Sequence, residues 1–475
     1  MTEPFVIVGG DAAGLSAASK LKRENPDREV IVFEKGSWVS YAHCGMPYYV
    51  KGEVDSLTDL LSLSPDEIAE REIDLRRRHE VVAVDPAART VTVESEAGRF
   101  EQPYGDLLIA TGAHAVSAPL DGVYLDGVFT MHSMDAAGAL RAYLTPPADT
   151  EAAHIDGEYV DRERVETYAA MDPPESAAIV GGGYVGVEMA EAFCAHDLDV
   201  HLFQRPDRLL SPFGDAAGDQ VAETLREHDV TLHLATEVDE LVGDGHVAGV
   251  ATDDKQVDAD LVLVGIGIQP NTELVGETAI ELGESGAIAT DDYGRTNVED
   301  VYAAGDCAEM CHTVTGASDW VPLGLTANRA GRAIGQTIAG TPTLVGDIAG
   351  TAVVKAFDME CGRTGLLDHD RARAAGFDPV SETITASSRS GYYPGAAETT
   401  VTLTADWDTG RLLGGSIVGE DRAAIRIDTL ATALDQDMTV SELERLDLAY
   451  APPFSPVWDP VLVAAKVLNG TLADT

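Results

Sequence analysis

Short runs of apolar residues separated by glycine-rich turns recur along the chain. Phe5 to Val8 is wholly apolar, as expected of a buried strand in a parallel sheet, and a helical pattern at 15–23 follows a turn at 9–14. Val30 to Glu34 is a second apolar run that ends in an acid. The same order of strand, turn, helix and strand returns at 177–203. This pattern predicts two units of the βαβ type.

The pattern changes in the second half of the chain. Asp260 to Gly267 and Val301 to Asp306 are further buried strands that end beside glycine. Apolar and polar residues then alternate at 399–403 and 412–418, and a helical pattern follows at 423–434. The last part of the chain is therefore expected to form an α+β domain.

We predict an α/β fold with two Rossmann-like dinucleotide-binding domains of three-layer architecture and a C-terminal α+β domain. The expected boundaries are 1–115 together with 285–345 for the first domain, 116–284 for the second and 346–475 for the third. A segment near 145–174 is rich in Pro, Asp and Glu, and we expect an acidic surface insertion or an interdomain crossing there.

The first glycine-rich turn has the spacing of a dinucleotide-binding fingerprint. The N-terminus of the helix after it offers free N–H groups to a pyrophosphate, and Glu34, about twenty residues on, can bond a ribose diol. One residue departs from the motif, because Asp11 replaces its second glycine. A carboxylate there would crowd or repel phosphate unless its side chain points away.

The second turn, Gly181 to Gly186, fits the fingerprint without substitution. Its following strand ends in Gln204 and Arg205, where units selective for NAD carry an acid. A neutral amide beside a guanidinium can accept a 2′-phosphate, so NADPH is favoured or at least tolerated. The alternative is that Arg205 simply faces solvent.

The composition of the chain indicates in which environment the protein works and which binding partners are disfavoured. The 475 residues carry 81 acidic and 32 basic side chains, a formal charge of −49, which disfavours nucleic acid and anionic membranes as partners. In molar salt the screening length falls to about 3 Å, so such a surface is tolerable in a salt-loaded, haloarchaeal cytoplasm; an acidic mesophilic protein is the alternative. No leader pattern and no apolar run near the ~18 residues of a spanning helix is present, so we expect a cytoplasmic protein.

The five cysteines are dispersed, which argues against a secreted disulfide framework. Cys44 stands alone between Ser40 and Tyr49, just after the first nucleotide unit, and we expect it to be redox-active. His43 beside it could lower the pKa of the thiol as a neighbouring cation, although adjacent side chains often point apart. Cys307 and Cys311 lack a second ligand set, so we predict helical core packing for them and no metal site.

Over nearly the whole chain these motifs resemble the flavin-dependent pyridine nucleotide-disulfide oxidoreductases. The family's dithiol members use a Cys-x4-Cys pair, but Val39 and Tyr49 stand five residues before and after Cys44, so the resemblance is to the single-cysteine branch of coenzyme A disulfide reductases and NADH oxidases. It implies FAD, NAD(P)H and a homodimer in which the stretch Leu448 to Ser455 reaches the partner's flavin and cysteine. The cofactor-binding residues that we expect are Gly9, Gly10, Ala12, Ala13, Gly14, Glu34, Lys35, Ser40, Val82, Thr111, Gly112, Asp306, Gly181, Gly183, Tyr184, Val185, Gly186, Gln204, Arg205, Gly267 and Phe454.

The resemblance implies two chemistries for one thiol beside a flavin. In the first, Cys44 attacks coenzyme A disulfide, or a related small disulfide or persulfide, and forms a mixed disulfide that flavin reduced by NAD(P)H releases. Tyr450 of the partner subunit resembles the tyrosine proposed to protonate the leaving thiolate, and Tyr392 or Tyr393 would assist. Candidates for a basic groove that holds coenzyme A are Lys22, Arg23, Lys51 and Arg71.

In the second chemistry Cys44 cycles through a sulfenic acid, and the enzyme is an NADH oxidase or peroxidase. Relatives of that kind carry a histidine in the first glycine turn, where this chain has Ala12, which weakens this alternative. A flavin-containing, redox-responsive interaction protein that turns over poorly is the alternative from a different functional class.

Overall fold

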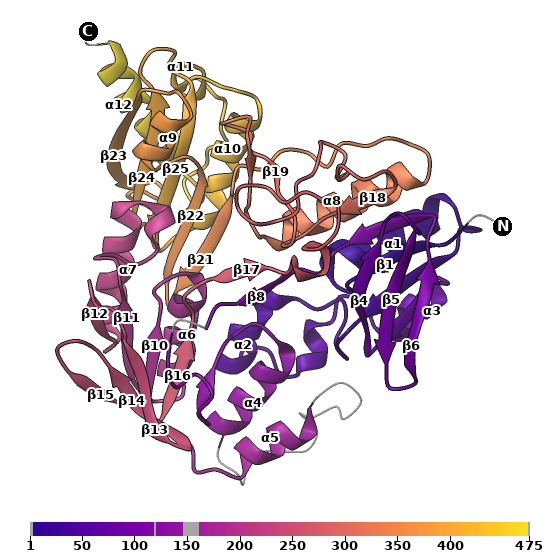
Figure 1. The fold of residues 1–475 in the computed structure, drawn as a ribbon. Coiled ribbons are helices and arrows are strands. Elements are labelled where there is room, and N and C mark those ends of the chain that lie inside the picture. Colours follow the sequence, from indigo (N-terminus) through magenta and orange to yellow (C-terminus); the bar gives the residue numbers. More distant parts are fainter. Residues whose placement is uncertain (1–2, 118–119, 146–160, 474–475) are drawn as a thin grey trace.

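The computed structural model describes residues 3–117, 120–145 and 161–473 (Figure 1). The first unit is built on a parallel sheet of five strands. Their order across the sheet is β18 (Val301–Ala303), β7 (Asp106–Ile109), β1 (Phe5–Val8), β2 (Val30–Glu34) and β3 (Asp74–Arg77). The strand at 301–303 therefore completes a sheet that begins at the N-terminus.

Side-chain alternation along β1 explains the layers of this unit. Phe5 and Ile7 pack against the helices α1 (Ala12–Glu24) and α8 (Gly324–Ile338), whereas Val6 and Val8 pack against a three-stranded antiparallel sheet on the other face. That second sheet consists of β4 (His79–Asp85), β5 (Thr90–Ser95) and β6 (Gly98–Pro103). The unit thus has three layers: helices, parallel sheet and antiparallel sheet.

Helices α1 and α8 pack unusually closely. A Cβ atom at Gly331 would lie 2.1 Å from the carbonyl oxygen of Ala13, and one at Gly335 would lie 2.4 Å from that of Ala17. Only glycine fits at these two points of α8, since no side-chain atom can approach backbone so closely.

The second unit repeats the plan. Its parallel sheet has the order β12 (Thr231–Leu234), β11 (Asp199–Gln204), β10 (Ser176–Val180), β16 (Leu261–Val264) and β9 (Val128–Phe129). One face carries the antiparallel strands β13 (Glu240–Asp244), β14 (His246–Ala251) and β15 (Gln256–Asp258). The other face packs on α4 (Met134–Leu144), α5 (Arg162–Ala169), α6 (Tyr184–Cys194) and α7 (Asp215–Glu227).

The C-terminal domain is an antiparallel sheet covered by helices. The strand order is β21 (Ala352–Ala356), β22 (Met359–Gly365), β25 (Leu412–Gly419), β24 (Glu398–Asp406) and β23 (Pro379–Ser387). The helices are α9 (His369–Ala374), α10 (Ala423–Asp435), α11 (Val440–Leu443) and α12 (Pro460–Ala473). A small antiparallel pair, β8 (Ala113–Ala115) and β17 (Ile268–Pro270), runs through the middle of the molecule between the three parts (Figure 1).

The architecture is the predicted one, with local corrections. Helix α1 begins at Ala12 rather than at Leu15, and α6 begins at Tyr184, because the last residues of each glycine-rich turn already form the first turn of the helix. Shortly after the predicted strand that ends at Gly267, Gln269 and Pro270 belong to a further short strand, β17. We keep the division into 1–115 with 285–345, 116–284 and 346–475 as a proposal.

The helical placement expected for Cys307 and Cys311 is wrong. Cys307 and Cys311 are not helical: Cys307 lies buried in a turn, where its Sγ is 3.5 Å from the carbonyl oxygen of Ile109, and Cys311 belongs to the short strand β19 (Met310–Cys311). Across the described part of the chain, no group of three or more His, Cys, Asp or Glu is arranged to hold a metal.

Within the expected insertion, residues 146–160 lie outside the described residues. The helix that follows them, α5, packs Tyr168 against Phe129 at 4.8 Å between ring centroids. None of the described helices combines the length and apolarity needed to cross a bilayer.

Candidate active site

One large cavity, about 2410 Å³ in volume, is lined by both glycine-rich turns and by the cysteine loop. This exceeds the roughly 300–1,000 Å³ typical of a pocket for one drug-sized ligand, so two extended molecules fit. Every cofactor-binding residue expected from the sequence lines it except Gly14, Gly186 and Phe454. Gly14 and Gly186 serve the turns themselves, since a Cβ atom there would lie 2.0 and 1.9 Å from the carbonyl oxygens of Gly9 and Gly181.

The first turn is closed by Glu34 at the end of β2. The Glu34 carboxylate accepts hydrogen bonds from the backbone N–H of Gly10 at 2.9 Å and of Gly36 at 2.7 Å. Gly9 has φ +112°, and a Cβ atom there would lie 2.1 Å from the carbonyl oxygen of Ala110, so only glycine is accommodated. A carboxylate so fixed at a strand end is placed for a ribose, and the start of α1 is free for phosphate.

Asp11 is turned toward the cysteine loop. Its Oδ1 accepts a hydrogen bond of 3.0 Å from the backbone N–H of Tyr41, and its Oδ2 lies 3.2 Å from Nδ1 of His43. Burial raises the pKa of Asp11 to about 7, and the neighbouring Glu34 carboxylate adds to this rise while the Tyr41 N–H opposes it. The side chain that replaces the motif glycine thus has its own partners across the cavity wall.

Cys44 lies in a single 3-10 turn, His43–Gly45, that leads into α2 (Met46–Lys51). The residue is exposed, and a Cβ atom at its neighbour Gly45 would lie 2.3 Å from the end of the Leu60 side chain, which would have to shift. Burial raises the pKa of the Cys44 thiol, and the negative charges of Glu188 and Asp306 raise it further. The protein alone therefore disfavours the thiolate.

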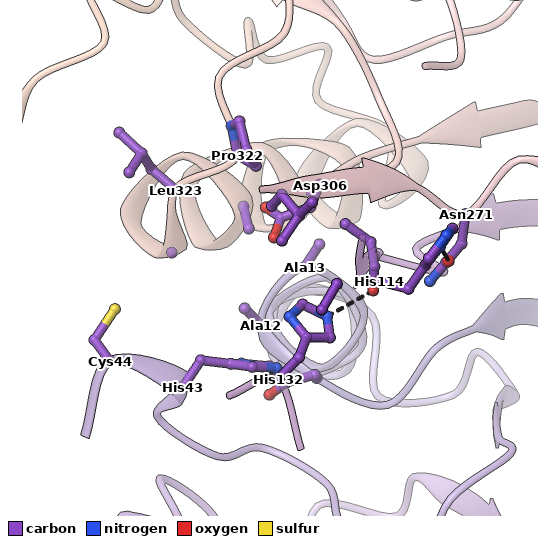
Figure 2. A pocket seen from close by; sticks show the side chains of 18 of the residues that line it. Ala12, Ala13, His43, Cys44, His114, His132, Asn271, Asp306, Pro322 and Leu323 are labelled. Carbon is purple, nitrogen blue, oxygen red and sulfur yellow. Dashed lines mark hydrogen bonds and ion pairs between the residues drawn. The ribbon is translucent and has the colours of Figure 1, made fainter. Parts of the chain in front are cut away.

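His43 does not act as a cation that lowers the pKa of this thiol. Figure 2 shows its side chain extending from the loop toward His132, and the two ring centroids are 5.7 Å apart. Burial lowers the pKa of His43 to about 4, and the proximity of His132 lowers it further, so the ring is neutral at pH 7. Of the two possibilities left open by the sequence, the structure therefore favours the one in which the side chains of His43 and Cys44 point apart.

Two cavity residues were missed by the sequence analysis. His132, after β9, places its Nε2 at 2.7 Å from the carbonyl oxygen of Ala113 (Figure 2). Glu188 on α6 accepts a hydrogen bond of 3.0 Å from the hydroxyl of Tyr48, and burial raises its pKa to about 7. Glu188 carried a usable signal, because it follows the cavity residue Tyr184 by one helical turn; His132 carried none.

The second turn matches the first. Gly181 has φ +113°, and the N–H of Gly182 donates a 2.8 Å hydrogen bond to Oε1 of Gln204 at the end of β11. The Arg205 side chain is 76% exposed, and its guanidinium lies 3.8 Å from the Glu237 carboxylate. The region where a ribose would sit thus holds an amide, an exposed guanidinium and one acid.

The tyrosines expected near the thiol are not brought there within one chain. Tyr392, Tyr450 and Phe454 are 77%, 49% and 63% exposed on the C-terminal domain, and none of them lines the cavity. Tyr393 also lies outside it, with its ring 6.0 Å from the Arg389 guanidinium carbon. Within one chain these aromatic side chains therefore lie outside the cavity that Cys44 lines.

A basic region lies at one part of the cavity wall. Arg23 on α1, Arg71 after α3 (Pro65–Glu70), and Arg329 with Arg332 on α8 all line it. Lys22 and Lys51, the other two residues proposed for a basic groove, do not: Lys22 bonds the carbonyl oxygen of Pro26, and Lys51 pairs with Glu191 at 2.6 Å.

The chain belongs to the pyridine nucleotide-disulphide oxidoreductase family. The family model matches residues 3–325, and the model of the family's dimerisation domain matches residues 351–460. Members of this family use FAD and NAD(P)H, and the two turns, Glu34 and the size of the cavity fit both groups.

Particular relatives are similar over almost their whole length. The NAD(P)H coenzyme A polysulfide/persulfide reductase of Pyrococcus horikoshii is 40% identical, with 99% of each chain covered, and the NADH oxidase of Methanocaldococcus jannaschii is 30% identical, with 97% of each covered. Among solved structures, an NAD-dependent persulfide reductase from A. fulgidus has a TM-score of 0.90 at 32% identity, covering 98% of this chain and 83% of that one.

Proposed function

We propose that this protein is an FAD-dependent NAD(P)H:disulfide oxidoreductase that reduces coenzyme A disulfide, or a related small disulfide or persulfide, through Cys44. One observation carries the proposal. Among the described residues that line the cavity, Cys44 is the only cysteine, and it shares that cavity with both nucleotide turns. A single thiol there has no partner within the chain, so the second sulfur must come from the substrate.

The sulfur chemistry balances with one pyridine nucleotide per turnover. The Cys44 thiolate attacks one sulfur of R–S–S–R, the S–S bond breaks, and the other half leaves as a thiolate that takes up a proton. FAD, when bound, passes two electrons from NAD(P)H to the resulting mixed disulfide. The second RSH is then released, Cys44 returns to its reduced form, and NAD(P)⁺ leaves.

Substrate recognition is assigned to the basic region of the wall. Arg23, Arg71 and Arg329 offer guanidinium groups, which suit the phosphates of a coenzyme A moiety. Their clustering matters in a chain with 81 acidic and 32 basic residues, since the remaining surface would repel such a ligand. A persulfide carried on coenzyme A would use the same contacts.

The proton for the leaving thiolate is assigned to a second copy of the chain. The exposed apolar and aromatic residues Tyr450, Phe454 and Trp458 lie within or beside the matched dimerisation segment, which supports a homodimer. Tyr450 of the partner subunit, assisted by Tyr392 or Tyr393, would then face Cys44. Five free cysteines and the charge of the chain support a reducing, cytoplasmic location.

A second candidate function is NADH oxidation through a sulfenic acid at Cys44. The NADH oxidase relative favours it. Ala12 speaks against it, because an alanine methyl beside the first turn offers no proton-transferring group.

The deciding experiment compares Cys44→Ser with Cys311→Ser, a half-buried cysteine that does not line the cavity. We expect the first variant to bind FAD but to lose NADPH-driven reduction of coenzyme A disulfide, and the second to retain it. Mass spectrometry of the air-oxidised wild-type protein should find coenzyme A on Cys44. Turnover that survives in Cys44→Ser would sink the disulfide proposal, and a sulfenic acid in place of the adduct would favour the oxidase.

A further inference from the structure

We propose that Asp11 is a positioning residue that joins the phosphate-binding turn to the loop carrying Cys44. The inference rests on the proposed function only for the role given to Cys44. The contacts of Asp11, and the experiment below, do not require turnover.

The argument starts from the position of Asp11 in the chain. It directly precedes α1, at the point where the backbone of a dinucleotide fingerprint approaches the pyrophosphate. Its carboxylate does not cap the helix, since no side-chain capping bond is made there. Both oxygens are instead directed at residues 30 and 32 positions further along, namely the N–H of Tyr41 and the ring of His43.

The loop that receives these contacts has few other restraints of its own. Ser40 adopts a left-handed φ of +52°, an unfavourable conformation for a residue with a side chain, so the backbone must be held there by its surroundings. On one side, the N–H of Ala42 donates to the carbonyl oxygen of Leu60 at 2.9 Å and the N–H of Ser62 donates to that of Ser40. On the side of the nucleotide turn, one backbone bond of 3.0 Å runs from the N–H of Ser40 to the carbonyl oxygen of Gly10, and the Asp11 side chain adds a second tie beyond it.

His43 extends the tie to the residue before the thiol. The Tyr41 and His43 rings pack with centroids 4.2 Å apart, and His43 reaches Asp11 through Nδ1. Figure 2 shows the His43 side chain extending toward His132, whereas the Cys44 sulfur points in a different direction. A side chain anchored at residue 43 fixes the backbone from which the next side chain projects, so Asp11 sets the direction of Cys44 without touching it.

The hydrogen bond between Asp11 and His43 needs only one proton, carried by either residue. With His43 neutral, its Nδ1 either donates to the Asp11 carboxylate or accepts from the protonated acid, and the contact persists in both forms. An asparagine at position 11 can reproduce both bonds, because its oxygen accepts from the Tyr41 N–H and its NH₂ donates to a neutral Nδ1. An alanine can reproduce neither.

Hydrogen–deuterium exchange on the FAD-containing protein tests this arrangement. In Asp11→Ala we expect exchange in the peptide over residues 40–45 to rise about tenfold or more, as for the loss of a hydrogen bond to a charged group, and in Asp11→Asn to stay close to wild type. His43→Ala should raise exchange at residues 43–45 while Tyr41 stays protected, and Asp253→Ala, an exposed acid, is the control.

Turnover provides a second readout. Asp11→Ala should lower kcat with coenzyme A disulfide while the KM for NADPH stays unchanged, because the second turn is untouched. Unchanged exchange in Asp11→Ala would overturn the proposal, as would failure of Asp11→Asn to restore protection. These outcomes can be read even if Cys44→Ser refutes the disulfide function, and if Asp11→Ala does not fold, His43→Ala and Asp11→Asn still decide.

Discussion

Glu34 and Gln204 occupy equivalent positions in the two nucleotide units. Each stands at the end of the second strand of its unit and accepts a hydrogen bond from the N–H of the second turn residue, Glu34 from Gly10 at 2.9 Å and Gln204 from Gly182 at 2.8 Å. The second unit therefore keeps the hydrogen bond of the first, but Gln204 lacks the negative charge of Glu34. The amide keeps the turn closed without the carboxylate that would repel a 2′-phosphate.

Gln204→Glu should therefore shift the nucleotide preference toward NADH. The variant keeps the bond to Gly182 and adds a negative charge beside Arg205. We expect the ratio of kcat/KM for NADPH over NADH to fall by about tenfold or more, which corresponds to ~1.4 kcal/mol. Glu34 in the first unit is unchanged, so FAD content measured by absorbance should stay constant. An unaltered ratio would contradict the assignment of Gln204 to cofactor selection.

Arg71→Ala should weaken the binding of the disulfide substrate without affecting the binding of the pyridine nucleotide. Arg71 donates a 2.9 Å hydrogen bond to Ser19 at the basic part of the cavity. Loss of a charge-assisted phosphate contact should raise the KM for coenzyme A disulfide about tenfold. Lys22→Ala, which lies on α1 close to Ser19 but outside the cavity, is the matched control. If both variants behave alike, the basic region does not bind substrate.

Glu188→Gln should make the Cys44 thiolate easier to form. Burial is the main cause of the raised thiol pKa, and the Glu188 charge adds to it once that acid ionises near pH 7. Removing the charge lowers the thiol pKa, so the midpoint of iodoacetamide labelling of Cys44 should move to lower pH, by less than about one unit. Glu227→Gln, an exposed acid at the end of α7, should leave the midpoint in place.

The same acid should also affect folding stability. The pKa of Glu188 rises from 4.5 to about 7 on folding, chiefly through burial, so the native protein holds a proton that the unfolded chain releases. Stability therefore falls as pH rises through this interval, and Glu188→Gln should recover up to about 3 kcal/mol at pH 8 but almost nothing at pH 4. Urea unfolding at the two pH values measures this, and an equal effect at both would argue for altered packing instead.

Phe454→Asp should separate the proposed homodimer. The Phe454 side chain is 63% exposed, so a negative charge there costs the monomer little stability. The same charge would strongly destabilise a dimer in which that side chain is buried. We expect sedimentation velocity to show a monomer that retains its fold by circular dichroism. Leu344→Asp, at a residue that is 58% exposed beside the first unit, should remain dimeric. A Phe454→Asp variant that stays dimeric would place the interface elsewhere.

The sequence predicted what is local and periodic. The apolar runs at 5–8 and 177–180, the glycine spacing and the terminal acid Glu34 predicted both nucleotide turns, because burial on two faces and backbone approach each leave a pattern in neighbouring residues. The alternation over 399–403 and 412–418 likewise predicted β24 and β25.

Contacts between distant residues left no such pattern. The tie from Asp11 to Tyr41 and the arrival of His132 at the cavity wall depend on how loops meet in three dimensions. The spacing of Cys307 and Cys311 resembles one helical turn, yet a tight turn and a two-residue strand are formed because the segment follows β18 directly into the core. The role proposed for Tyr450, Tyr392 and Tyr393 depends on a second chain, and the arrangement of two chains is not described by a pattern within one.

The close fit of α8 against α1 has a consequence for how the protein is made. The first nucleotide unit begins at Phe5 but lacks an edge strand and a covering helix until the ribosome has added β18 and α8, which ends at Ile338. At about 5–20 residues per second this takes roughly 20–70 s. From the completion of β7 at Ile109 until α8 is made, the nascent chain exposes an open sheet edge at β7 and the uncovered alanines of α1.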